Sequence, residues 1–174
     1  MSKIEVKKIT NANIYLDGNN LLGRAEEVSL PTVKAKMVDH AALGLVGVPE
    51  FPSGIEKLDG GKIKWASLYP EVFAKAANPF VVYDLQVRGN LETYNSRGRV
   101  SEEPVVALLS ASFKTLPMGQ YKPRDNAEFE TDLAVHYIKL IAGGIEVLEI
   151  DVLANIWRAN GMDMLTNYRA NIGA

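Results

Sequence analysis

Three long stretches of this 174-residue chain alternate apolar and polar residues, and this alternation limits the possible folds more than any other feature. They cover residues 81–92, 105–115 and 127–139. In the first, apolar residues such as Leu85 and Val87 fall on odd positions, with charged or amide residues between them. A period of two is typical of a β-strand with one face on a core and the other in water. The chain is therefore expected to be mostly β, with long antiparallel strands.

The alternation also assigns side chains to faces. The side chains expected to point into the core from the third stretch are Phe129, Leu133, Val135 and Tyr137. The charged residues on the opposite, polar faces of the three stretches are Asp84, Arg88, Glu92, Lys114, Glu128, Glu130 and Asp132. Carboxylates outnumber cations in this set, which predicts a polar face of net negative charge.

Turn and helix signals place the other elements. Asp17-Gly18 before Asn19-Asn20 predicts a hairpin within residues 11–24, because these residue types tolerate positive φ. One helix is predicted at residues 69–77, where Pro70 suits the first turn and a following Asn-Pro pair ends the helix. The expected architecture is an antiparallel β-barrel or sandwich with one flanking α-helix and a long extended loop, a single domain over residues 1–174.

The long loop is expected at residues 41–55, AALGLVGVPEFPSGI. Its glycines and prolines interrupt both the helical and the strand period, yet Leu45, Val46 and Phe51 are residues that a solvated loop normally lacks. An apolar patch of this kind marks a surface that another molecule covers, although such a loop could also fold back over its own core. We expect an interaction loop at about residues 40–58, contacting copies of the chain or a partner.

Composition excludes several functional classes. The chain has no cysteine, so it contains neither a disulfide nor a thiol nucleophile. Its 19 basic and 21 acidic residues nearly balance, which disfavours general attraction to nucleic acid or anionic membrane. Neither histidine has the neighbours of a metal site or catalytic base, and no P-loop, dinucleotide or nucleophile-elbow motif is present. We expect no enzyme activity, no cofactor, no metal and no membrane anchor.

The C-terminal third carries a run of short motifs: Lys139-Leu140, Gly144, Glu146-Val147, Glu149-Ile150-Asp151, Asn155, Asn160-Gly161, Asp163, Leu165 and Arg169-Ala170-Asn171-Ile172-Gly173. Together with TNANIYLDGNNLLG near the start and ALGLVG at residues 42–47, this run resembles the major tail tube proteins of contractile-tailed bacteriophages and R-type pyocins. The resemblance extends over nearly the whole chain.

This resemblance implies a structural subunit that forms hexameric rings stacked into a hollow tube inside a contractile sheath. The implied partners are other copies of the chain, the sheath protein, the tape-measure protein, the baseplate, and genomic DNA that passes through the lumen without sequence-specific binding. The implied location is the virion tail, assembled in the host cytoplasm. On this basis the seven polar-face residues named above would line the lumen. The expected ring-to-ring interface comprises Leu43, Gly44, Leu45, Val46, Gly47, Phe51, Ile55, Arg169 and Asn171.

Two alternatives stay open at this point. One is the tube protein of a type VI-like secretion system or a bacteriocin. The other is a small-molecule-binding β-barrel in which the apolar loop acts as a lid. An aromatic content of only 8 % counts mildly against the ligand-binding barrel.

Overall fold

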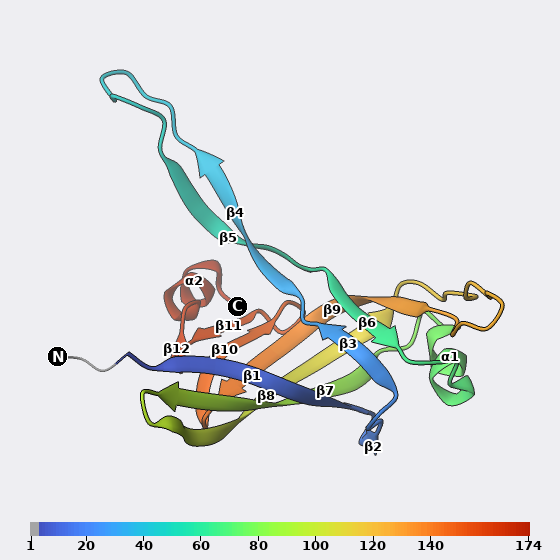
Figure 1. Cartoon of the computed structure of the whole chain (residues 1–174). Coiled ribbons are helices and arrows are strands. Elements are labelled where there is room, and N and C mark those ends of the chain that lie inside the picture. Colours follow the sequence, from blue (N-terminus) through green and yellow to red (C-terminus); the bar gives the residue numbers. More distant parts are fainter. Residues whose placement is uncertain (1–3) are drawn as a thin grey trace.

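The computed structural model describes residues 4–174, which form a curved β-sheet body with a long projecting hairpin (Figure 1). The elements, in chain order, are β1 (Val6–Leu16), β2 (Asn19–Asn20), β3 (Ala25–Ser29), β4 (Thr32–Asp39), β5 (Glu50–Asp59), β6 (Gly61–Trp65), α1 (Pro70–Ala76), β7 (Tyr83–Asn95), β8 (Gly98–Phe113), β9 (Phe129–Ala142), β10 (Ile145–Asp151), β11 (Ile156–Ala159), β12 (Met162–Asp163) and α2 (Thr166–Ile172). The expectation of a mostly β, antiparallel fold is confirmed.

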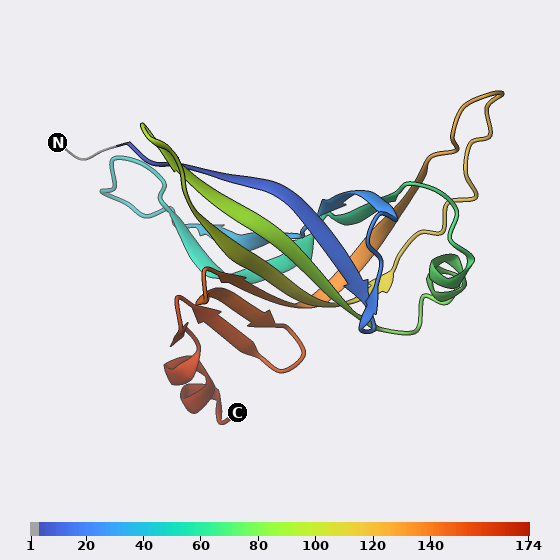
Figure 2. The same ribbon diagram turned by 60° about the horizontal axis from the view of Figure 1, so that its bottom comes forward.

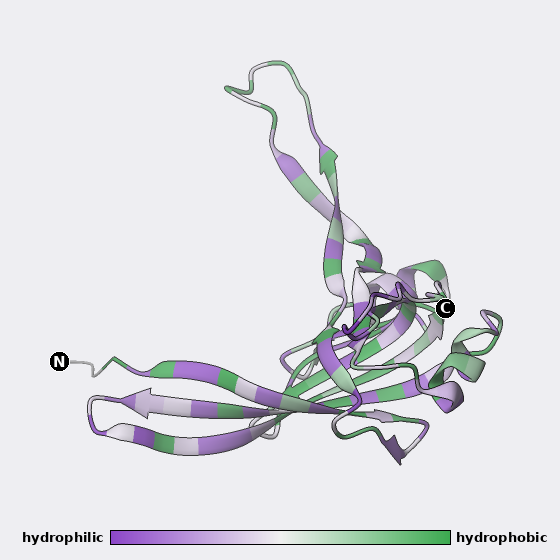
Figure 3. Cartoon of the chain, turned by 45° about the vertical axis from the view of Figure 1, so that its right-hand side comes forward, coloured by the Kyte–Doolittle hydropathy of each residue, from purple (hydrophilic) through white to green (hydrophobic). Residues whose placement is uncertain are grey.

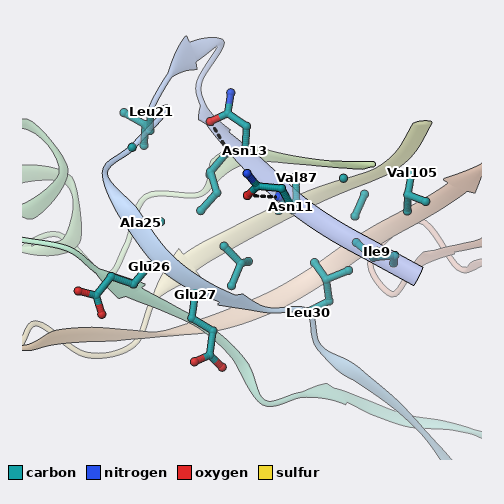
Figure 4. A pocket seen from close by; sticks show the side chains of 16 residues that line it. Ile9, Asn11, Asn13, Leu21, Ala25, Glu26, Glu27, Leu30, Val87 and Val105 are labelled. Atoms are coloured by element: carbon teal, nitrogen blue, oxygen red, sulfur yellow. Dashed lines mark hydrogen bonds between the residues drawn. The ribbon is translucent and has the colours of Figure 1, made fainter. Parts of the chain in front are cut away.

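The main sheet runs in the order β12-β11-β10-β9-β8-β7-β1-β2, and it branches at β9. The C-terminal half of β9 pairs with β10, whereas its first residues pair with β6, which in turn pairs with β3. The sheet curls over on itself (Figure 2). Strands β3 and β1 line a cleft of about 270 Å³ (Figure 4). Across this cleft the two edge strands are not paired.

The core fills the concave side of the sheet. Its most completely buried side chains are Trp65, Phe113, Phe129, Ile63, Ile150, Val72 and Thr131. Helix α1 covers one end of this core with Val72 and Ala76, and Phe73 meets Phe129 edge to face at 5.3 Å between ring centroids. The helix predicted at residues 69–77 is therefore confirmed, as are the alternating strands on which it rests.

One predicted inward residue points the other way. Ser110 is the partner of Tyr137, but the next residue, Ala111, is the partner of Val135, so His136 is an extra residue in β9. A bulge of this kind exchanges the two faces of a strand. As a result Ile138 is buried, whereas the hydroxyl of Tyr137 donates to a carboxylate oxygen of Glu149 at 3.1 Å.

Two other expectations need correction. Residues 41–55 are not all loop, because β5 begins at Glu50 and pairs with β4 in a separate two-stranded sheet. Pro52 does not prevent pairing because its strand has a partner on only one side. Gly54 has a φ of 119° and lies where the register between β4 and β5 shifts, so the pairing accommodates it as well. The structure also has a second helix, α2, that was not predicted.

Candidate assembly surfaces

The β4–β5 hairpin is exposed along most of its length. Every residue from Thr32 to Ser53 is exposed, and Leu43 and Val46 at its tip are fully accessible, at 105 % and 110 %. Figure 3 shows apolar residues recurring along this projection, far from the core. An isolated two-stranded hairpin is only marginally stable in water. Apolar side chains on such an element therefore indicate a surface that another molecule covers.

Charged side chains hold the base of the hairpin. Lys34 and Lys57 contact the same Asp59 carboxylate oxygen at 3.0 and 3.1 Å, and Lys36 lies 3.8 Å from Glu56. Hydrogen bonds from Lys34 and Lys57 lower the pKa of Asp59 to about 2. At the tip, the N–H of His40 donates to the carbonyl of Pro49 at 2.9 Å. The hairpin thus has an ion-paired base and a closed tip, and residues 41–49 at this tip include no charged side chain.

A groove of about 610 Å³ lies between the hairpin base and the C-terminal elements. Its walls include Ile55 and Leu58 of β5, Trp157 of β11 and Tyr168 of α2. No residue of α2 is buried. Instead, Arg169 fastens the helix by donating to the carbonyl of Asn155 at 3.0 Å and by pairing with Asp163.

The expected ring-to-ring residues therefore fall into two groups. Five of them, Leu43, Gly44, Leu45, Val46 and Gly47, form the hairpin tip, and Phe51 follows on β5. Ile55 and Arg169 are partly covered within the subunit, while Asn171 is exposed at the end of α2. The structure does not bring the two groups together, since one is at the tip of the hairpin and the other lies around the groove at its base.

The polar face of the main sheet contains cations that the sequence did not indicate. Lys62 of β6 lies 2.9 Å from Glu130 and 3.5 Å from Asp132, and Lys64 lies 3.3 Å from Glu26. The ion pair with Glu130 raises the pKa of Lys62. With both lysines and Glu26 included, six carboxylates on this face meet four cations, so its excess of negative charge is smaller than predicted. Asp84, Arg88, Lys114, Glu128 and Glu130 are exposed.

Glu92 differs from the other polar-face residues, because it is only 7 % exposed. It lies where β1, β7 and β8 extend beyond the rest of the sheet as a three-stranded arm, comprising residues 6–9, 91–95 and 98–103. The Tyr94 hydroxyl and the Arg99 guanidinium both donate to Glu92, and these bonds lower the pKa of its carboxyl. Arg99 also reaches Glu102 at 2.9 Å.

The hairpin tip described above is an exposed apolar surface, and comparison with known proteins identifies the family to which the chain belongs. A family model described as phage tail tube protein FII matches residues 6–173. The chain belongs to this tail tube family. The resemblance noted in the sequence is confirmed, and so is the assignment of the chain as a structural tail tube subunit.

Individual relatives agree with the family match. The tail tube protein of Escherichia phage P2 is 25 % identical over 173 residues, covering 96 % of this chain and 97 % of the phage protein. Among solved structures, the sheath–tube complex of an extracellular contractile injection system, PVC, has a TM-score of 0.53 at 14 % identity, over 75 % of this chain and 88 % of the other. The sheath/tube terminator of the same system has a TM-score of 0.52 at 13 % identity, over 75 % of this chain and 92 % of the other. These structures share the fold.

Two observations complete the description of this tail tube subunit. Neither helix within residues 4–174 has the length and apolar character needed to cross a membrane. The same residues contain no cluster of three or more His, Asp or Glu side chains suited to holding a metal ion.

Proposed function

We propose that this tail tube subunit forms hexameric rings, that the rings stack into a hollow tube inside a contractile sheath, and that DNA passes through the tube. The observation that carries the stacking proposal is the hairpin tip, where Leu43 and Val46 are fully exposed on a projecting element. A monomer gains nothing from such a surface. Stacking on an adjacent ring would cover it.

The interface proposed for stacking includes Leu43, Gly44, Leu45, Val46, Gly47 and Phe51 from the hairpin, with Ile55, Arg169 and Asn171 at the receiving end. Each tip contributes a small area, so single subunits stay apart. A ring presents its tips together, and linked contacts gain strength through effective concentration. Stacking should therefore be far stronger between rings than between free subunits.

The test replaces Leu45 and Val46 with aspartate. Leu45→Asp/Val46→Asp should give folded subunits or single rings and no tubes, because burying a pair of charges at each contact is unfavourable. Leu45→Ile/Val46→Leu keeps the apolar surface and should form tubes. Negative-stain electron microscopy of concentrated protein distinguishes the results. Tubes of normal length from the aspartate variant would contradict the assigned interface.

The polar face of the sheet, with Asp84, Arg88, Glu92, Lys114, Glu128, Glu130 and Asp132, is the proposed lumen wall. A surface with a net negative charge does not hold the phosphate backbone, so DNA would slide past it. Glu128 is the position to change, because Glu130 and Asp132 are already paired with Lys62. Particles with Glu128→Lys should eject DNA more slowly than particles with Glu128→Gln. Equal ejection rates for the two variants would mean that Glu128 does not line the lumen.

The proposed partners follow from the same assignment. They are the sheath protein, the tape-measure protein and the baseplate, with assembly in the host cytoplasm before incorporation into the virion tail. We assign no catalytic role and no cofactor. An injection particle is the second candidate, because two similar structures, with TM-scores of 0.52 and 0.53, come from a contractile injection system. Finding DNA inside purified particles would support the assignment to a phage tail. Particles without DNA would support the assignment to an injection particle.

A further inference from the structure

We infer that the loop between β8 and β9, residues 114–128, contacts the phosphate backbone of duplex DNA through Lys114, Lys122 and Arg124. This segment is called the basic loop below. The inference rests on the proposed passage of DNA through the tube and names the side chains that would touch it. Three observations support it: the cations have no carboxylate partner, the loop is held against the body, and Arg124 has a backbone conformation that arginine disfavours.

The cations of the basic loop are not neutralised within the chain. Lys114, Lys122 and Arg124 outnumber the carboxylates of the loop, which are Asp125 and Glu128. All three cations are exposed, and no carboxylate among residues 4–174 lies within salt-bridge distance of any of them. Most other lysines and arginines of this part of the chain have such a partner. Unpaired cations gathered on one loop attract a polyanion, and in the proposed tube that polyanion is DNA.

The basic loop lies at the end of the proposed lumen wall. Strand β8 ends at Phe113 and β9 begins at Phe129, so the loop joins two strands of that wall. Figures 1 and 2 show the loop, coloured yellow to orange, extending from the body beside α1 and away from the start of β1. A connection of this length with no helix or strand of its own is usually functional or disordered. In a ring, six copies would place a circle of cations at one end of the lumen.

Contacts with the body hold the basic loop in place. The hydroxyl of Thr115 accepts from the N–H of Asp132 at 2.8 Å, and a Cβ on Gly119 would not fit against the ring of Phe129. Near the other end of the loop, the side chain of Asn126 donates to a backbone carbonyl of the segment before α1. The cations are therefore presented on a preformed element, and binding through them would cost little loop ordering.

Arg124 has a left-handed backbone. It lies in a turn over residues 122–125, where the N–H of Asp125 donates to the carbonyl of Lys122 at 3.4 Å. Pro123 is the second residue of this turn and Arg124 the third, with a φ of 62°. A proline followed by a positive φ is the arrangement of a type II turn, whose third position favours Gly or Asn. The other non-glycine residues with positive φ within residues 4–174 are all Asp or Asn. Backbone strain of this kind is typical of functional sites, and it indicates that Arg124 is present for its charge.

DNA binding in solution tests the inference. The full-length protein is titrated into fluorescently labelled duplex DNA at several salt concentrations, with anisotropy as the readout. Lys122→Gln/Arg124→Gly should weaken binding several-fold. It should also reduce the slope of log K against log salt by about 1.8 for each subunit on the DNA, because each lost phosphate contact contributes about 0.9.

The matched control is Lys8→Gln/Arg97→Gly, which removes the same charge at the other end of the sheet. Both residues are exposed, and neither has a carboxylate of residues 4–174 at salt-bridge distance. Lys8 lies near the start of β1, and Arg97 lies in the turn between β7 and β8. This variant should bind DNA like the wild type.

Thermal unfolding separates the charge of Arg124 from any role in the fold. Arg124→Gly removes the guanidinium and relieves the left-handed backbone, so it should bind DNA more weakly and yet melt at a higher temperature than the wild type. Arg124→Lys keeps the charge and should retain most of the binding. A lower melting temperature for Arg124→Gly would give this residue a structural role and contradict the inference.

The results distinguish this inference from the proposed tube. If wild-type tubes form but the loop variant binds DNA as tightly as the control variant, or the wild type binds no DNA, the inference is wrong and the tube proposal stands. The inference is also wrong if the loop variant binds DNA normally but forms no tubes, since the loop then contacts another protein chain. If the wild-type chain forms no tubes, the tube proposal fails, whereas loss of DNA binding in the loop variant alone would still support the basic loop.

Discussion

The indole N–H of Trp65 donates to the hydroxyl of Thr131 at 3.0 Å, and both side chains are almost completely buried. The bond joins β6 to β9 at the point where the sheet branches. Thr131→Val keeps the shape and adds apolar surface, but it leaves the indole N–H without an acceptor. We expect a loss of about 1–3 kcal/mol in the free energy of unfolding, measured by urea denaturation.

Thr131→Ser is the matched control for this bond. It keeps the acceptor and removes one methyl group, at a cost of about 1 kcal/mol from lost apolar burial. A Thr131→Val variant as stable as the wild type would mean that the bond contributes nothing to the joint between β6 and β9.

Gly119 should not tolerate a side chain. A Cβ at this position would lie 2.5 Å from Cε1 of Phe129, a ring that is 2 % exposed and held by Phe73. Gly119→Ala should cost about 1–3 kcal/mol for the clash, beyond the roughly 1–2 kcal/mol of its left-handed backbone. Gly144→Ala has a similar φ with no atom within 4 Å, so it isolates the backbone cost. Equal melting temperatures for the two variants would contradict the close approach.

Asp59 should titrate far below an ordinary carboxyl. Its pKa is about 2 in the folded protein against an ordinary value of 3.8, because Lys34 and Lys57 both donate to it. A pKa that is lower in the folded state stabilises the hairpin base above about pH 4, and the stabilisation is lost as the pH falls toward 2. Carboxyl NMR should give a midpoint near 2, and Lys34→Ala should move it upward. A wild-type midpoint near 3.8 would show that the lysines do not contact this carboxylate in solution.

The side chains of Asn11 and Asn13 should restrict association along β1, because their oxygens cap its edge by accepting from the N–H groups of Ala12 and Ile14, both at 2.8 Å. Asn11→Ala/Asn13→Ala leaves these two N–H groups without their side-chain acceptors, and unpaired groups on a strand edge are a template for another strand. We expect irregular aggregates at the expense of tubes, measured by light scattering and electron microscopy. Asn11→Asp/Asn13→Asp retains an acceptor at both positions and should behave more like the wild type. Uniform tubes from the alanine variant would mean that the caps have no such role.

The sequence predicted the elements whose pattern repeats locally. The alternation of apolar and polar residues was sufficient to predict β7, β8 and β9, and Pro70 was sufficient to predict the start of α1. Each of these elements buries one face, and that burial determines its local sequence pattern. The inward assignment of Tyr137 failed because the bulge at His136 depends on the pairing of β9 with β8. The strand β5 was missed because Pro52 and Gly54 break the period that a sequence displays, although its free edge and bulge accommodate them.

For the candidate surfaces too, the sequence predicted only features that are local in the chain. The apolar tip could be recognised from Leu43 to Val46, because its composition alone is unusual for a loop. The lysines that reduce the negative charge of the polar face could not be recognised, since β6 meets β9 only in the folded chain and Lys62 is far from Glu130 in sequence. Helix α2 gave no amphipathic signal because it buries no side chain and depends on Arg169.

The branching of the sheet at β9 has a mechanical consequence. Bonded to β8 on one side and to β6 and β10 on the other, β9 can be pulled along its length only by shearing several ladders at once. The β4–β5 hairpin, in contrast, is a separate two-stranded sheet and can be peeled from its base one bond after another. Under an axial load the body of the subunit should stay intact while the hairpin yields, so a tube built from it would break between rings before any subunit unfolds.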